Sequence, residues 1–164
     1  MDKMKITADH PNIIKEIDMR HQYKANQKNP IFLYGPSRSG KTTVLKMIED
    51  YLFSKKGIKV FRLDAEDIVE ELIRSIRKSG DAEGFYYKLH GCDALLIDNI
   101  WVLRGRPRTE QEIFNLFKTL IDKGKLVVIA SDISPEMLMQ RRKTDTELYK
   151  HSITFKMKLF NPST

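Results

Sequence analysis

The sequence has few of the residues from which covalent or metal-based frameworks are built. Among its 164 residues there is one cysteine, Cys92, and the four histidines show no paired ligand spacing. A single cysteine excludes an internal disulfide framework and most cysteine-based zinc sites. The chain must therefore be stabilised by a hydrophobic core, and we expect Cys92 to be a small buried part of it.

Long apolar runs are also missing. The longest strand-like run covers only residues 126–130, whereas a membrane-spanning helix needs about 18 apolar residues. The N-terminal residues 1–5 lack the apolar segment of a secretory signal. These absences predict a cytoplasmic protein with no membrane partner.

The composition that remains is that of one globular domain with a basic excess. Hydrophobic residues make up 41% and charged residues 31%, so enough apolar surface exists to offset the entropy of ordering the chain. Lysine and arginine number 29 against 22 aspartate and glutamate, which gives a net charge of +7. A basic balance favours anionic partners, and part of it is ordinary solvated surface.

Strand-like and helix-like segments alternate along the chain. Apolar runs predict strands at 31–34, 58–63, 94–98, 126–130 and 153–159, with helices between them. This order predicts parallel pairing through right-handed crossovers, and therefore an α/β fold: a three-layer sandwich around a mainly parallel five-stranded sheet. Residues 1–28 are interpreted as an N-terminal lead-in and residues 29–164 as the core.

Helix signals predict several boundaries. Helices are expected at 41–53, from the N-cap Asp64 to Ser79, and from Ser134 through Met139. The helix after Asp64 carries one stripe of apolar residues that we expect to face inward: Ile68, Val69, Leu72, Ile73 and Ile76. Thr109 followed by Glu112 matches a capping box at the start of another helix, which Gly124 is expected to end.

A glycine-rich loop follows the first predicted strand. Residues 35–42 match the pattern G-x-x-x-x-G-K-[ST], in which glycines let backbone N–H groups surround a phosphate and the next helix adds its positive dipole end. Lys41 is expected to bind the β- and γ-phosphates, and the Thr42 hydroxyl to bind Mg²⁺. The predicted nucleotide-binding residues are Gly35, Pro36, Ser37, Arg38, Ser39, Gly40, Lys41, Thr42 and Thr43.

An acidic residue ends the third predicted strand. Asp98 follows the apolar run 94–97, as does the Walker B acid that supports Mg²⁺ in P-loop ATPases. The next residue is Asn99; in ATPases of this layout a carboxylate at this position, or one position further on, polarises the attacking water. An amide cannot accept that proton, so we expect ATP binding with weak or no hydrolysis.

Several blocks together are similar to the AAA+ domain of the bacterial replication initiator DnaA family. These blocks are residues 29–35, the glycine-rich loop, 64–67, 93–100, 104–112 and 127–132, in family order and at family-like spacing. The resemblance implies an AAA+ core that binds ATP or ADP with Mg²⁺. It also implies a role in DNA replication initiation or in its regulation, with other replication proteins as partners.

The resemblance further implies roles for individual residues. Asp132 occupies the position that reads the γ-phosphate, so Lys41, Asp98 and Asp132 are the catalytic candidates and Thr42 and Asp98 the magnesium candidates. The polypeptide ends at Thr164, just after the fifth predicted strand, which implies that the helical lid domain of the family is absent.

One basic segment is expected to contact DNA. In the family the segment aligned with residues 105–109 contacts single-stranded DNA, which here assigns Arg106, Arg108 and Thr109 to that role. Two arginines and a hydroxyl at a helix N-terminus suit backbone phosphates. The alternative is a solvated basic loop.

The arginine finger of the family has no counterpart in register. It is expected near residues 148–149, whereas Arg141 and Arg142 stand several residues upstream. An ATP-bridged oligomer is therefore not predicted. Two other functions remain open at this point: a non-enzymatic AAA+ module that binds a replication protein, and a small P-loop kinase, which shares the glycine-rich loop and the length.

Overall fold

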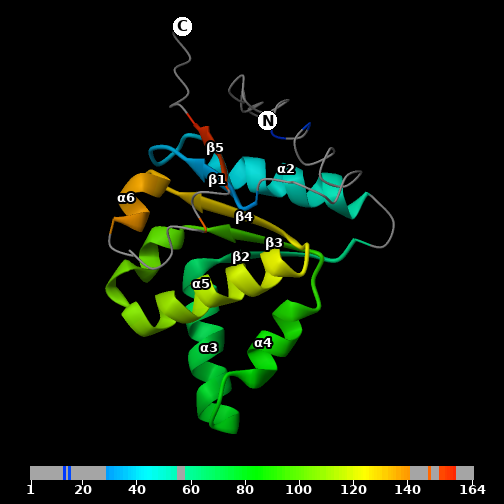
Figure 1. Cartoon of the computed structure of the whole chain (residues 1–164), viewed down its shortest axis with the longest axis vertical. Helices are drawn as coiled ribbons and strands as arrows, with labels where there is room; N and C mark the ends of the chain where they lie inside the picture. The colour runs from blue at the N-terminus through cyan, green and yellow to red at the C-terminus, as the bar shows by residue number, and fades with distance from the viewer. Residues whose placement is uncertain are drawn as a thin grey trace, which may run out of the picture.

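A five-stranded parallel sheet forms the centre of the structure. The computed structural model describes Ile13, Lys15, Leu148 and residues 29–54, 58–140 and 152–157. The strands are β1 (Ile31–Tyr34), β2 (Val60–Asp64), β3 (Ala94–Asp98), β4 (Leu126–Ser131) and β5 (Ile153–Lys156). They lie in the order β2-β3-β4-β1-β5, and each neighbouring pair is parallel (Figure 1). The predicted fold class is confirmed.

Helices cover both faces of this sheet. They are α2 (Lys41–Phe53), α3 (Ala65–Ser79), α4 (Glu83–His90), α5 (Pro107–Asp122) and α6 (Pro135–Met139), with a 3₁₀ helix η1 (Ile100–Gly105) after β3. Figure 1 shows α2 on one side of the sheet and α3, α4 and α5 on the other. This arrangement follows from the crossovers, because the connection between two parallel strands must return the chain to the same end of the sheet, and the helices that do so lie against its faces.

Side-chain alternation along the strands divides the core into two layers. Ile31 and Leu33 pack with Val44, Leu45 and Ile48 of α2. The residue between them, Phe32, belongs to the other layer, which contains apolar residues of α3, α4 and α5. Because successive strand residues point to opposite faces, a strand that is apolar throughout can be buried on both sides.

Most predicted boundaries agree with the structure. The predicted bounds of α2 and α6 are confirmed, and Gly80 and Gly124 end α3 and α5 with φ of 81° and 76°. The Asp64 carboxylate accepts a hydrogen bond from the Glu66 N–H as the N-cap of α3. Cys92 is fully buried, as expected. Strand β2 is shifted by one or two residues from its predicted span, and positions 158 and 159 of the last predicted strand lie outside the described residues.

The inward stripe predicted for α3 is wrong at two positions. Ile68, Val69 and Leu72 are buried, but Ile73 and Ile76 are 41% and 45% exposed. In Figure 1, α3 runs on beyond the edge strand β2, away from the sheet and beside α4. The second half of α3 therefore has no sheet against which to bury these isoleucines.

The predicted capping box at Thr109 is also wrong. Helix α5 begins two residues earlier, at Pro107, and the side chain of its N-cap residue, Arg106, makes no capping hydrogen bond. Proline favours the first helical position, because its φ is preset and it has no N–H that needs a partner there. Thr109 consequently lies within the first turn of the helix.

The two kinds of position on α3 give a matched test of this packing. We expect Leu72→Ala to lower the free energy of unfolding by about 2–4 kcal/mol, because it leaves a cavity in the core. Ile76→Ala, on the exposed side of the same helix, is expected to change it by less than about 1 kcal/mol. Urea denaturation monitored by circular dichroism measures both, and equal losses would contradict the packing of α3.

Candidate functional site

A polar cavity lies at the carboxyl ends of the central strands. The loops that follow β1, β3 and β4 meet there, as expected where ligands bind parallel sheets. The cavity has a volume of about 210 Å³ and is lined by Ser37, Arg38, Gly40, Lys41, Thr42, Thr43, Asp98, Asn99 and Asp132. Eight of these nine residues are predicted site residues, and the exception is Asn99.

The glycine-rich loop between β1 and α2 has two left-handed residues. Arg38 has a φ of 66° and Gly40, directly before α2, a φ of 93°. Gly35 is constrained differently: a Cβ at this position would clash with the carbonyl oxygen of Met157. Its N–H also donates to the Ser131 carbonyl over 3.3 Å. Gly35 is thus required by the close approach of the chain after β5.

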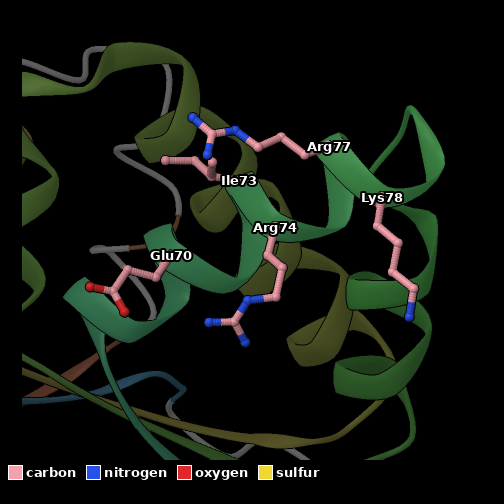
Figure 2. Close-up of a pocket in the computed structure, with 5 residues that line it drawn as sticks. All are labelled: Glu70, Ile73, Arg74, Arg77 and Lys78. Carbon is pink, nitrogen blue, oxygen red and sulfur yellow. The ribbon is translucent and has the colours of Figure 1, made fainter.

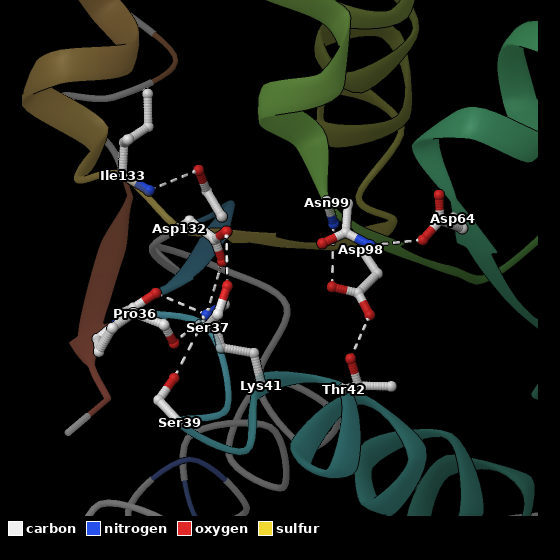
Figure 3. Close-up of polar contacts among 12 residues, drawn as sticks. Pro36, Ser37, Ser39, Lys41, Thr42, Asp64, Asp98, Asn99, Asp132 and Ile133 are labelled. Atoms are coloured by element: carbon white, nitrogen blue, oxygen red, sulfur yellow. Dashed lines mark hydrogen bonds and ion pairs between the residues drawn. The ribbon is translucent and has the colours of Figure 1, made fainter. Parts of the chain in front are cut away.

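Lys41 is the most enclosed charge of the site. Its side chain is 6% exposed, and its Nζ donates to the carbonyl oxygens of Gly35 and Pro36 at 2.6 and 2.8 Å and to Ser39 Oγ at 3.3 Å (Figure 3). Nζ also lies 2.9 Å from Asp132 Oδ1. Gly35, Pro36 and Ser39 do not line the cavity; they hold the lysine that does.

Asp132 connects the end of β4 to the glycine-rich loop. Besides its ion pair with Lys41, it accepts a hydrogen bond from the Ser37 hydroxyl at 3.3 Å. The preceding residue, Ser131, accepts a hydrogen bond from the Ile133 N–H, which holds the turn that carries Asp132. The structure therefore brings Asp132 to the same cavity as Lys41, although 91 residues separate them in the chain.

The two predicted magnesium residues are in direct contact. The Thr42 hydroxyl donates to Asp98 Oδ2 at 2.6 Å, and the other carboxylate oxygen of Asp98 accepts from the Asn99 N–H at 2.9 Å. The oxygen atoms of a hydroxyl and a carboxylate are suitable ligands for Mg²⁺, and Mg²⁺ at phosphate sites needs only one or two protein ligands. The donor set therefore fits Mg²⁺. Within the described ranges there is no group of three His, Cys, Asp or Glu residues able to hold a metal by themselves.

A contact that the sequence analysis missed involves Asp64 and Asn99. The Asn99 Nδ2 donates to Asp64 Oδ2 at 2.6 Å. Figure 3 shows this bond on the side of Asn99 opposite the glycine-rich loop. The available signal was that Asp64 and Asp98 each end a strand, but the sequence does not reveal that β2 and β3 are neighbours.

The predicted DNA-contacting residues lie outside this cavity. Arg106 and Arg108 are exposed and Thr109 is half-buried, at the junction of η1 and α5. Arg141 and Arg142, considered for the arginine finger, lie outside the described residues.

A second hollow lies on the outer face of α3. It has a volume of about 560 Å³ and is lined by Glu70, Ile73, Arg74, Arg77 and Lys78, so three of its five residues are basic (Figure 2). Helix α3 also packs against η1, which leads to Arg106. The sequence analysis missed this face because it placed Ile73 and Ile76 inside.

In the part of the chain that the structure describes, no helix is long and apolar enough to cross a membrane.

The fold and the loop define the class of the chain. A parallel sheet in the order β2-β3-β4-β1-β5, with a G-x-x-x-x-G-K-[ST] loop after β1 and an acid at the end of β3, is a P-loop NTPase core of the AAA+ type. The chain belongs to the bacterial DnaA ATPase domain family, whose pattern matches residues 13–151.

Individual DnaA proteins are similar to this chain in sequence and in fold. The chain is 34% identical over 120 residues to the chromosomal replication initiator protein DnaA of Acinetobacter baylyi, which is 73% of this chain and 26% of that protein. It is similar to AMPPCP-bound DnaA from Aquifex aeolicus with a TM-score of 0.79 and 25% identity, covering 93% of this chain and 47% of that one. A structure of DnaA bound to AMPPCP and single-stranded DNA has the same fold, with a TM-score of 0.79 and 24% identity, over 93% and 47% of the two chains. The chain spans about a quarter of the length of the curated relatives it matches.

Gly35 offers a test of the loop's packing. We expect Gly35→Ala to lower the free energy of unfolding by about 1–3 kcal/mol, because the new methyl group displaces the backbone at Met157. Gly84→Ala is the control, since open space surrounds that helical glycine and alanine there is expected to stabilise by about 0.5–1 kcal/mol. Thermal unfolding measures both, and a melting temperature unchanged by Gly35→Ala would contradict the close approach.

Proposed function

We propose that this protein binds ATP with Mg²⁺ at the cavity formed by β1, β3 and β4, hydrolyses it slowly, and acts in DNA replication initiation or its regulation. The observation that carries this proposal is the convergence of Lys41, Thr42, Asp98 and Asp132 on one cavity. Membership of the DnaA ATPase domain family and the AMPPCP-bound relative support it.

Each residue of the cavity has a role in this proposal. The N–H groups after Pro36 and the N-terminus of α2 surround the phosphates, and Lys41 exchanges its contacts with loop carbonyls for contacts with phosphate oxygens. Thr42 and Asp98 hold Mg²⁺, which neutralises charge on the phosphates when it is bound. Asp132, ion-paired with Lys41, is placed to respond when a γ-phosphate competes for the lysine.

Slow hydrolysis follows from Asn99. This residue follows Asp98 and lines the cavity, but its amide has no basic oxygen that takes a proton at neutral pH. General-base catalysis contributes about 10²–10⁴-fold in enzymes that use it, so its loss leaves a slow reaction. ATP then acts mainly as a bound signal.

The same residue favours one alternative function. A chain that binds nucleotide without turnover is suited to a non-enzymatic module that presents its surface to another replication protein. Steady-state hydrolysis, with and without single-stranded DNA, separates the two: turnover that depends on Lys41 excludes the module.

Single-stranded DNA is the proposed anionic partner. Arg106 and Arg108 are exposed, and the N-cap residue of α5, Arg106, makes no capping hydrogen bond with its side chain; the dipole of this helix N-terminus favours phosphate. A relative of the same fold is described as bound to single-stranded DNA.

Removal of the loop lysine tests nucleotide binding. We expect Lys41→Ala to weaken ATP binding by about 10- to 100-fold, because charge-assisted hydrogen bonds to phosphate are lost. Lys46→Ala, an exposed lysine of the same helix, is the control and should bind as the wild type does. Isothermal titration calorimetry with ATP and Mg²⁺ measures both, and equal affinities would refute the proposed site.

Salt dependence tests the DNA contact. For Arg106→Ala with Arg108→Ala, we expect weaker binding to a single strand and a decrease of about 1.4 in the slope of log K against log salt, since each phosphate contact contributes about 0.7. The control is Lys123→Ala, an exposed lysine at the other end of α5. Fluorescence anisotropy over a salt series gives the slopes, and identical slopes would show that the arginines do not bind the strand.

A further inference from the structure

The ends of β2 and β3 place a carboxylate beside Asn99. These neighbouring strands are parallel and in register, with Asp64 opposite Asp98 at their carboxyl ends. Asn99 is the next residue and has a left-handed backbone, with φ of 57° and ψ of 41°. This conformation, which asparagine tolerates better than most residues, turns the chain sharply after β3. The Asn99 side chain is thereby brought to the end of β2.

The contact between these two side chains fixes the Asn99 amide. Its Nδ2 donates to Asp64 Oδ2 at 2.6 Å. A carboxylate accepts hydrogen bonds but donates none, so it selects the nitrogen over the oxygen of the amide. Because the amide is planar, its oxygen faces away from Asp64, toward the cavity that Asn99 lines (Figure 3).

Asp64 is itself held in place. Its Oδ1 accepts the Glu66 N–H at 2.9 Å as the N-cap of α3, while Oδ2 accepts from Asn99. With one oxygen committed to the helix, the carboxylate cannot rotate without breaking the cap. The other oxygen is therefore a fixed acceptor at a position set by the start of α3.

We propose that Asp64 is a positioning residue of the nucleotide site: it orients Asn99 so that the amide oxygen, and not the amide nitrogen, faces the phosphates. The position after Asp98 carries an amide, Asn99, and the neighbouring strand β2 ends in an acid, Asp64. Asp64 and Asn99 thus form an acid–amide pair. This inference rests on the proposed nucleotide binding at the same cavity.

The orientation decides what Asn99 does to water. An amide oxygen accepts a hydrogen bond from water and aligns it, whereas an amide nitrogen competes with water as a donor to the phosphates. In hydrolysis the water oxygen forms a bond to the γ-phosphorus, the bond to the β–γ bridging oxygen breaks, and the water proton passes to a phosphate oxygen. Asn99 takes no proton, and Asp64 touches neither water nor nucleotide.

The pair also predicts that its two members depend on each other. Asn99→Asp alone places two carboxylates in contact, and like charges at this distance repel. Exchange of the two residues, Asp64→Asn with Asn99→Asp, restores one acid and one amide with the same net charge. In the exchanged pair a carboxylate oxygen faces the cavity.

The test begins with Asp64→Asn, which preserves size and the ability to cap α3. The cap on the Glu66 N–H needs an acceptor, so the new amide keeps its oxygen there and turns its nitrogen to Asn99. Because two facing amides must pair nitrogen with oxygen, the Asn99 amide turns round. We expect kcat for ATP hydrolysis to fall about tenfold while ATP affinity stays within about twofold, because one hydrogen bond to the attacking water is lost. The exposed Asp67→Asn, with the same charge change in the first turn of α3, is the control and should leave kcat unchanged.

A spectroscopic readout is independent of hydrolysis. In the ¹H–¹⁵N spectrum of the full chain without nucleotide, the Asn99 side-chain NH₂ pair is identified by its loss in Asn99→Asp. We expect one proton of the pair to be shifted downfield by the bond to Asp64, and this shift to disappear in Asp64→Asn but persist in Asp67→Asn.

The exchanged double variant provides the rescue. We expect it to hydrolyse ATP at least as fast as the wild type, and up to about 10²-fold faster, because the carboxylate that now faces the cavity accepts the water proton. A wild-type kcat and an unmoved Asn99 resonance in Asp64→Asn, or a double variant no faster than Asp64→Asn, would overturn the inference. Absence of ATP binding to the wild type would instead refute the proposed function, and the NH₂ shift would still report on the pair.

Discussion

The site depends on the parallel pairing of β1 with β4 on one side and β5 on the other. This pairing places the glycine-rich loop near the middle of the sheet, where the Gly35 N–H donates a hydrogen bond to the carbonyl of Ser131, the last residue of β4, and Gly35 lies against Met157 after β5. The loop is therefore fixed at both flanks before any side chain of the cavity is considered. Lys41 and Asp132 meet as a result, since Lys41 follows β1 at the end of the glycine-rich loop and Asp132 follows β4 directly.

The local features of this chain and the residues of its sequence motifs were predictable, whereas the order of the strands and the contacts that depend on it were not. The strand-loop-helix segment around Lys41 is defined by residues adjacent in sequence, so the bounds of α2 and the composition of the loop follow from the pattern. The order of the strands is not encoded locally, and the contact between Asp64 and Asn99 depends on it. The inward stripe of α3 failed for the same reason. Periodicity gives the apolar face of a helix, but only the position of the sheet edge decides how much of that face is covered.

Burial divides the basic charge of the chain into two kinds. Lys41 is nearly buried and compensated by Asp132 and by backbone carbonyls, so it adds little to the outer electrostatic surface. Arg74 and Arg77 on α3 and Arg106 and Arg108 before and within α5 are exposed. Because exposed charges are screened over about 8–10 Å at physiological salt, their contribution to binding is salt-dependent. The buried lysine acts at short range, where screening is weak.

Asp64 joins these two parts of the molecule through one carboxylate. One oxygen begins α3, the helix that carries the outer basic face, and the other holds the residue that follows Asp98 in the nucleotide cavity. Each oxygen accepts one of these two hydrogen bonds, so the acceptor that orients Asn99 is fixed relative to the first turn of α3. The position after Asp98 thus has an amide, Asn99, in place of a carboxylate, and the nearby carboxylate is Asp64 at the end of β2. The hydrogen bond from Asn99 to Asp64 explains why an amide suits that position.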